Sequence, residues 1–174
     1  QVYDTLVQSR ACFWEDSTAI PSLARSWEFS TDGLTLTLRL RDDVRWHNKP
    51  PVNGRPFTSA DVAFTIEHQK QGGLLRSYWD GLDHTEPDAQ TVVLRLKEPQ
   101  ADLLAKLAYH TNIMVPREVK EQSGDYKRVA IGTGPFTMEQ FSPGQNTRLA
   151  RNPNYYLKGE DGQSLPYIDE IRAE

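Results

Sequence analysis

The stretch Ser30-Thr31-Asp32-Gly33-Leu34-Thr35-Leu36-Thr37-Leu38-Arg39-Leu40-Arg41 decides the fold class of this chain. Asp32-Gly33 supplies turn chemistry, and leucines then alternate with threonine and arginine as far as Arg41. Apolar residues at every second position turn one face of a strand toward a core, and a turn reverses the chain into a neighbouring strand. Trp27 and Phe29 alternate with polar neighbours before the turn. The pattern predicts a β-hairpin with one buried face.

A helix is predicted over residues 59–70. Thr58-Ser59-Ala60-Asp61 forms a capping box, in which the Thr58 hydroxyl can accept the Asp61 amide while the Asp61 carboxylate reaches back. Phe57 and Val62 have the spacing of a hydrophobic staple, and Gly72-Gly73 marks where the helix should fade.

The remaining segments give short elements of both kinds. Alternation from 91 to 96 predicts a strand, and helical spacing at 103, 104, 107 and 108 predicts a helix. Further predicted elements are the end of a helix or strand at 2–7, a short buried strand at 113–115, a hairpin of 136–141 with 147–151, and a strand starting at 167. Together they predict an α/β fold with mixed sheets and flanking helices.

Composition sets limits on function. The chain has 174 residues, 37% of them apolar and 25% charged, with a net charge of −4, which suits one globular domain. Basic residues form no block, so nucleic acid is not an expected partner. The chain lacks an apolar run of 18 residues, so no transmembrane segment is expected, and its opening residues predict folded sequence rather than a signal peptide.

Enzymatic chemistry is the rival class. The sequence contains no Gly-x-Ser-x-Gly motif, and its four histidines are widely spaced, which disfavours a hydrolase triad and a zinc site. Cys12 is the only cysteine, so no internal disulfide forms, and its apolar neighbours favour a small core residue over a nucleophile. We expect no catalytic residue, metal or cofactor. The alternative functions are a hydrolytic enzyme and an interaction-only module.

Six segments, taken in order, resemble a known family. They are Pro21–Trp27 with Asp32–Thr35, Leu38–His47, Phe57–Val62, Ile131–Phe136, Arg151–Tyr156 and Pro166–Asp169. The chain is similar to the family 5 extracellular solute-binding proteins, which bind oligopeptides, dipeptides and nickel chelates for ATP-binding cassette importers. It departs from the commoner pattern at 48–56, where a proline-stiffened loop replaces a short glycine-rich turn.

The resemblance implies a periplasmic binding protein-like II fold, of which only lobe one is expected here. Residues 1–7 would end its first segment, 8–115 would form a subdomain, and 116–174 would return into lobe one before a missing lobe two. The chain is therefore expected to be a fragment of a monomeric, non-catalytic protein. Such a protein captures a solute, most commonly a peptide, and delivers it to the permease of an importer. It would be periplasmic or anchored to the outer face of the membrane.

The resemblance also implies ligand-binding residues. Arg76, Tyr78 and Trp79 follow the predicted helix, in a connection that runs toward the cleft in this family. An arginine fork suits carboxylates and an indole offers an apolar wall, although aromatic residues in loops also cover cores. Asn112 precedes the predicted strand at 113–115, where polar groups of the family face the cleft. The alternative places it in solvent at a strand start.

Thr133 lies in Gly132-Thr133-Gly134-Pro135 and completes the predicted ligand-binding set. Two glycines around a threonine before proline predict a tight turn with unusual backbone angles. The motif lacks the Gly-Lys-Ser/Thr ending of a phosphate-binding loop, so nucleotide binding is rejected. The expected contribution of Thr133 is positional, near the junction of the lobes.

Overall fold

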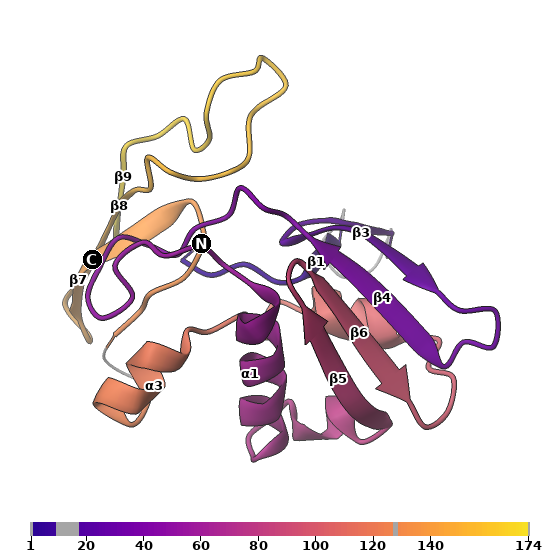
Figure 1. Ribbon diagram of the computed structural model, residues 1–174. Coiled ribbons are helices and arrows are strands. Elements are labelled where there is room, and N and C mark those ends of the chain that lie inside the picture. Colours follow the sequence, from indigo (N-terminus) through magenta and orange to yellow (C-terminus); the bar gives the residue numbers. More distant parts are fainter. Residues whose placement is uncertain (1, 10–17, 127–128, 174) are drawn as a thin grey trace. The chain divides into compact units, whose positions relative to one another are not determined.

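The structure is a computed structural model that describes residues 2–9, 18–126 and 129–173 (Figure 1). By contacts the chain divides into two compact units. Unit 1 comprises Gln1–Asp4, Asp43–Phe57 and Val115–Glu174, and unit 2 comprises Thr5–Asp42 and Thr58–Met114. The predicted division of lobe one at residues 7 and 115 stays a prediction. The units differ from it because Asp43–Phe57 clusters with the last part of the chain.

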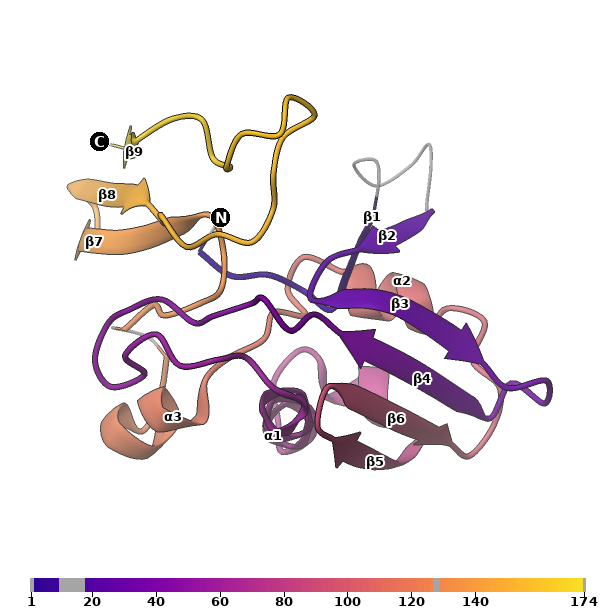
Figure 2. The same cartoon turned by 45° about the horizontal axis from the view of Figure 1, so that its top comes forward.

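Unit 2 contains a four-stranded antiparallel sheet, and Figure 2 shows its strands side by side in the order β3-β4-β6-β5. The strands are β3 (Ala24–Phe29), β4 (Thr35–Leu40), β5 (Leu82–Asp88) and β6 (Thr91–Leu96). Leu36, Leu38 and Leu40 are buried, as period-two burial requires. The predicted hairpin around Asp32-Gly33 and the predicted strand at 91–96 are therefore confirmed.

Helix α1 (Ser59–Lys70) has the predicted bounds. The backbone N–H of Thr58 donates to the Asp61 carboxylate at 2.9 Å and so uses one of the polar groups that a helix start leaves unpaired. The buried residues Val62 and Ile66 lie one turn apart on this helix. It packs against β5 and β6, beside which it runs in Figure 1.

The remaining elements of unit 2 are short. β1 (Val7–Ser9) pairs with β2 (Ala19–Pro21), and α2 (Leu103–Ala108), a confirmed prediction, packs against both. A 3-10 helix, η1 (Arg76–Trp79), follows α1. The predicted element at 2–7 is wrong for residues 2–6, which form no helix or strand. The carbonyls of Thr5 and Leu6 instead accept the amides of Leu23 and Ala24.

Unit 1 contains α3 (Arg117–Ser123) and a three-stranded antiparallel sheet, β7-β8-β9. β7 (Phe136–Ser142) and β8 (Asn146–Arg151) form the predicted hairpin, and Gly144 in its turn has a positive φ of 72°. β9 (Glu170–Ala173) begins three residues later than predicted, because 167–169 form bends.

The predicted strand at 113–115 is wrong. Met114 and Val115 are buried as an apolar run suggests, but residues 112–116 pair with no strand in the described part of the chain. An apolar run predicts burial, whereas a strand also needs a neighbouring backbone in register. The chain passes here from one unit to the other.

The loop 48–56 is tied into unit 1 at two points. The Arg55 guanidinium donates two hydrogen bonds to the Glu118 carboxylate of α3, one of them from Nη2 at 2.9 Å, and lies 5.8 Å from the Trp46 ring centroid. Lys49 donates to the Met138 carbonyl and pairs with Glu139 of β7 at 3.1 Å. The proline-stiffened loop therefore anchors its unit.

Candidate functional site

Trp79 is an anchor within unit 2. Its side chain is 2% exposed, and the indole Nε1 donates to Oε1 of Gln69 on α1 at 2.8 Å. A buried indole needs such a partner, because its N–H would otherwise lose the hydrogen bond that it makes in water. The indole fixes η1 against α1, which is the packing alternative considered for this residue. Its ligand-binding role stays a prediction.

Arg76 and Tyr78 occupy more accessible positions of η1. Arg76 is exposed and Tyr78 is half-buried. The Tyr78 and Tyr109 rings meet edge to face with centroids 6.1 Å apart, and the Tyr109 and His110 rings lie 4.5 Å apart. These three rings form an aromatic cluster after the end of α2. It brings η1 next to the segment that contains Asn112.

Asn112 is fully buried rather than facing solvent. Its side-chain Nδ2 donates to the Lys106 carbonyl at 3.0 Å, and its backbone N–H donates to the Tyr109 carbonyl at 2.7 Å. The Lys106 carbonyl, which lies in the last turn of α2, also accepts the Tyr109 amide at 3.3 Å, so the Asn112 side chain ties its own segment to the end of that helix. Oδ1 is buried and has no hydrogen-bond partner within the described residues. That oxygen is an acceptor for which the described residues supply no donor.

Thr133 lies in unit 1, whereas the other four predicted residues lie in unit 2. Its side chain is buried, and Oγ1 donates to the Asp4 carboxylate at 2.9 Å. The backbone bends at 133–135, but neither neighbouring glycine has a positive φ. The predicted unusual backbone angles are therefore wrong.

A close approach of another backbone segment explains why residue 132 is a glycine. A Cβ at this position would lie 2.0 Å from the Val2 carbonyl oxygen. Gly134 then donates its N–H to the same oxygen at 3.0 Å. Glycine is required here because the N-terminal backbone occupies the space that a side chain would fill.

Two titratable side chains sit against this segment. Burial raises the pKa of Asp4 from 3.8 to about 6, although hydrogen bonds from Thr133 and Tyr156 act in the opposite direction. Burial lowers the pKa of His47 below its ordinary 6.5, against the effect of its bond to the Gly134 carbonyl. Both shifts therefore disfavour charge in the interior of unit 1.

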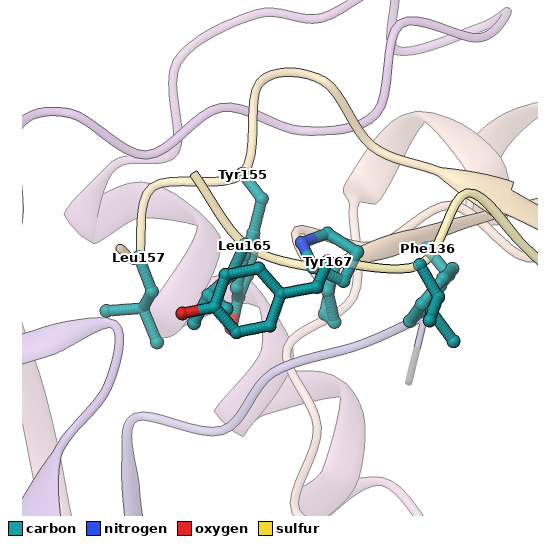
Figure 3. A pocket seen from close by; sticks show the side chains of 8 residues that line it. Phe136, Tyr155, Leu157, Leu165 and Tyr167 are labelled. Carbon is teal, nitrogen blue, oxygen red and sulfur yellow. The ribbon is translucent and has the colours of Figure 1, made fainter. Parts of the chain in front are cut away.

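Unit 1 also has a hollow that the sequence analysis did not predict. It measures about 360 Å³ and is lined mainly by apolar and aromatic side chains, which Figure 3 shows around it. Its lining residues are Pro135, Phe136, Tyr155, Leu157, Leu165, Pro166, Tyr167 and Ile168. The available signal was the aromatic and proline-rich sequence on both sides of the turn at 158–164.

Within the described ranges no group of three or more His, Cys, Asp or Glu side chains could hold a metal ion. Cys12, the candidate nucleophile and predicted core residue, lies outside the described residues. No helix of the part that the structure describes has the length and apolar character to cross a bilayer.

Comparisons with known proteins place these features in context. The sequence profile of bacterial extracellular solute-binding proteins, family 5 Middle, matches residues 18–174. The dipeptide-binding protein of Escherichia coli is 30% identical over 89% of this chain and 32% of its own length. Di/tripeptide-binding protein 2 of Pseudomonas aeruginosa is 31% identical over 89% of this chain and 32% of its own length.

The fold matches as well as the sequence. The periplasmic binding protein DppA of Helicobacter pylori, solved in complex with the peptide STSA, superposes with a TM-score of 0.81 at 27% identity. The match covers 98% of this chain and 36% of that one. This chain thus spans about a third of the length of the relatives that it matches.

Proposed function

We propose that this chain, which belongs to the family 5 bacterial extracellular solute-binding proteins, is the part of such a protein that captures a solute for an ATP-binding cassette importer. The observation that carries the proposal is the continuous family match over residues 18–174, together with relatives that are named as binding proteins. No catalytic step is part of the proposal. The hydrolase and interaction-only alternatives have no comparable observation in their favour.

A peptide is the proposed solute class. The E. coli and P. aeruginosa relatives are named for dipeptides and for di- and tripeptides, and the H. pylori protein was solved with a tetrapeptide. Peptides carry a terminal carboxylate, a terminal ammonium group, backbone N–H groups and variable side chains. A peptide site therefore needs cations, acceptors and apolar walls.

The predicted residues of unit 2 supply a cation, an acceptor and an aromatic surface. Arg76 is exposed and supplies a planar fork for a carboxylate, and half-buried Tyr78 supplies an aromatic surface. The Oδ1 atom of Asn112 is an acceptor for an N–H donor. We assign solute contact first to Arg76 and Tyr78, while Trp79 holds η1 in place.

Thr133 is assigned a different role within the proposal. Its hydroxyl proton is committed to Asp4, so any further hydrogen bond would use the lone pairs of Oγ1. Its side chain is 1% exposed, which favours the positional role over direct contact with a solute.

Solute capture is proposed to work by closure of two lobes. A ligand drives closure only through contacts that it makes in the closed state. One lobe supplies only part of those contacts, so the 174-residue chain alone should bind its solute weakly or not at all. A micromolar affinity of this chain for a peptide would contradict that expectation. The proposed partner is the membrane permease of the importer. The protein is proposed to be a monomer that lies in the periplasm or is anchored to the outer face of the cell membrane.

Calorimetry of the intact protein that carries this chain tests the proposal. Dipeptides, longer peptides, nickel chelates and oligosaccharides are titrated, and binding of peptides is expected. Arg76→Ala should then weaken peptide binding by about 10- to 150-fold, the range for a lost hydrogen bond to a charged group. Arg25→Ala, which removes an exposed arginine of β3 in the same unit, is the matched control and should leave affinity unchanged.

The outcomes separate the parts of the proposal. Peptide binding that Arg76→Ala leaves intact would keep the transport role and move the site elsewhere. Binding of another class alone would replace the peptide assignment. Absence of binding, combined with turnover of an ester or a phosphate substrate, would favour the enzyme alternative.

A further inference from the structure

His47 occupies an unusual position for a titratable side chain. It is 1% exposed in unit 1 and lies against the segment Gly132–Gly134. Its Nε2 is 2.9 Å from the Gly134 carbonyl oxygen, and its Nδ1 is 3.3 Å from the Gly132 amide nitrogen. Its own backbone N–H donates to the Gly132 carbonyl at 2.8 Å. One histidine therefore contacts this segment three times.

These contacts determine the protonation state of the ring. A carbonyl oxygen only accepts, so Nε2 must carry the proton that it shares with Gly134. A backbone N–H only donates, so Nδ1 must be without a proton in order to accept from Gly132. The ring is thus the neutral tautomer with its proton on Nε2.

We propose that His47 is a proton-operated latch, which holds Gly132–Gly134 while the ring is neutral and releases the Gly132 amide when Nδ1 takes a proton. A proton on Nδ1 would place the N–H of the ring against the backbone N–H of Gly132, and neither group can accept a hydrogen bond. The amide would lose its acceptor inside the unit, and the ring would become a buried charge. The latch goes beyond solute capture and does not depend on it.

The two charged groups beside the ring act in opposite directions on its pKa. Lys49 opposes a positive ring, Glu139 favours it, and the two pair with each other at 3.1 Å. Burial is the largest influence, and it lowers the pKa of His47 below the ordinary 6.5. The latch is therefore closed at neutral pH. The latch contributes its full stability at a pH above the pKa that His47 has in the unfolded chain. That contribution is lost as the pH falls from this value toward the lower pKa of His47 in the folded protein.

The other ties of the segment should survive acidification. Asn152 Nδ2 donates to the Gly134 carbonyl at 2.9 Å, and the Gly134 amide donates to the Val2 carbonyl at 3.0 Å; neither bond titrates. The Asp4 carboxyl, which accepts from Thr133, is favoured rather than penalised in acid. Release should therefore open the Gly132 contact locally and leave unit 1 folded.

Amide hydrogen exchange in the intact protein tests the latch without any solute. At a pH between the His47 pKa values of the unfolded and folded states, the open state of the latch binds one proton more than the closed state. The opening constant at Gly132 should then rise about tenfold for each pH unit lost. The Gly134 amide is an internal control, because its acceptor is Val2, and its protection should stay constant once intrinsic rates are corrected.

Two variants and a titration complete the test. His47→Gln keeps an acceptor and a donor but does not titrate, so Gly132 exchange should lose its pH dependence. His68→Gln, which alters a histidine of α1 in unit 2, should leave it unchanged. An NMR titration of the natural protein should show neutral His47 with its proton on Nε2. Constant Gly132 protection down to about pH 5, or a His47 pKa at or above 6.5, would overturn the proposal even if His47→Gln fails to fold.

Discussion

Replacement of Asp4 by Asn should make unit 1 more stable at neutral pH. Asp4 is 4% exposed and accepts the Thr133 hydroxyl at 2.9 Å, a bond that the Oδ1 of asparagine can also accept. Asparagine has nearly the same shape as aspartate but carries no charge. Asp4→Asn therefore removes the ionisation and keeps most of the packing.

The size of the effect follows from the pKa of Asp4. Burial raises it from 3.8 to about 6, a difference of about two units, and each unit corresponds to about 1.4 kcal/mol. A raised carboxyl pKa means that its stabilising contribution is complete below 3.8 and is lost as the pH rises through about 6. The charged form should therefore cost unit 1 about 3 kcal/mol above that pH, which Asp4→Asn avoids.

Hydrogen exchange of the β7 and β8 amides measures this effect within unit 1. At about pH 7.5 Asp4→Asn should raise their protection by as much as about 100-fold, and the gain should vanish below about pH 4. Asp169→Asn is the matched control, because the Asp169 side chain is 91% exposed and its ion pair with Arg151 is long, at 3.7 Å. Equal destabilisation by Asp4→Asn at both pH values would refute the reasoning, since it would mean that the ionised carboxylate is not penalised.

Two further substitutions test the packing of unit 1. Gly132→Ala should destabilise the unit by about 3 kcal/mol, because its methyl group would meet the Val2 carbonyl, whereas Gly72→Ala, with no other atom within 4 Å, should change stability by less than about 1 kcal/mol. Denaturant unfolding compares them, and equal effects would contradict the close approach. Arg55→Lys keeps the charge but cannot reproduce the two-pronged bond to Glu118, so amides of Asp43–Phe57 should exchange about tenfold faster. Unchanged exchange there would show that the arginine fork does not anchor the loop.

Much of the fold could be predicted because its signals are local. The bounds of α1 follow from a capping box and two glycines. The hairpin of β3 and β4 follows from Asp32-Gly33, with Trp27 and Phe29 alternating before it and leucines alternating after it. In both cases the conformational preferences of residues close together in the sequence favour the same local structure. The hairpin of β7 and β8 follows in the same way from the turn at 143–145.

The errors arose where distant segments decide the local structure. Gly132 was predicted from its own backbone angles, yet the reason for a glycine there is the carbonyl of Val2, which is 130 positions away in the sequence. Met114 was predicted in a strand because it is apolar, but the segment lacks a strand partner within the described residues. The hollow beside β7 likewise depends on how 155–168 folds back, which no local pattern encodes.

The predicted ligand-binding residues show the same limit, because the type of a residue does not reveal what its side chain contacts. Trp79, Asn112 and Thr133 were predicted from the family resemblance, which places such side chains at the cleft or near the junction of the lobes. In the structure each gives its donor to the chain itself: Trp79 to Gln69, Asn112 to the Lys106 carbonyl and Thr133 to Asp4. A donor that already has a buried acceptor gains little from a solute, because a new bond would have to replace the old one. Residue type alone cannot separate these two uses, whereas exposure and hydrogen-bond partners can. On that ground we propose that the exposed guanidinium of Arg76 contacts the solute, whereas the buried side chains of Trp79, Asn112 and Thr133 hold their own segments in shape.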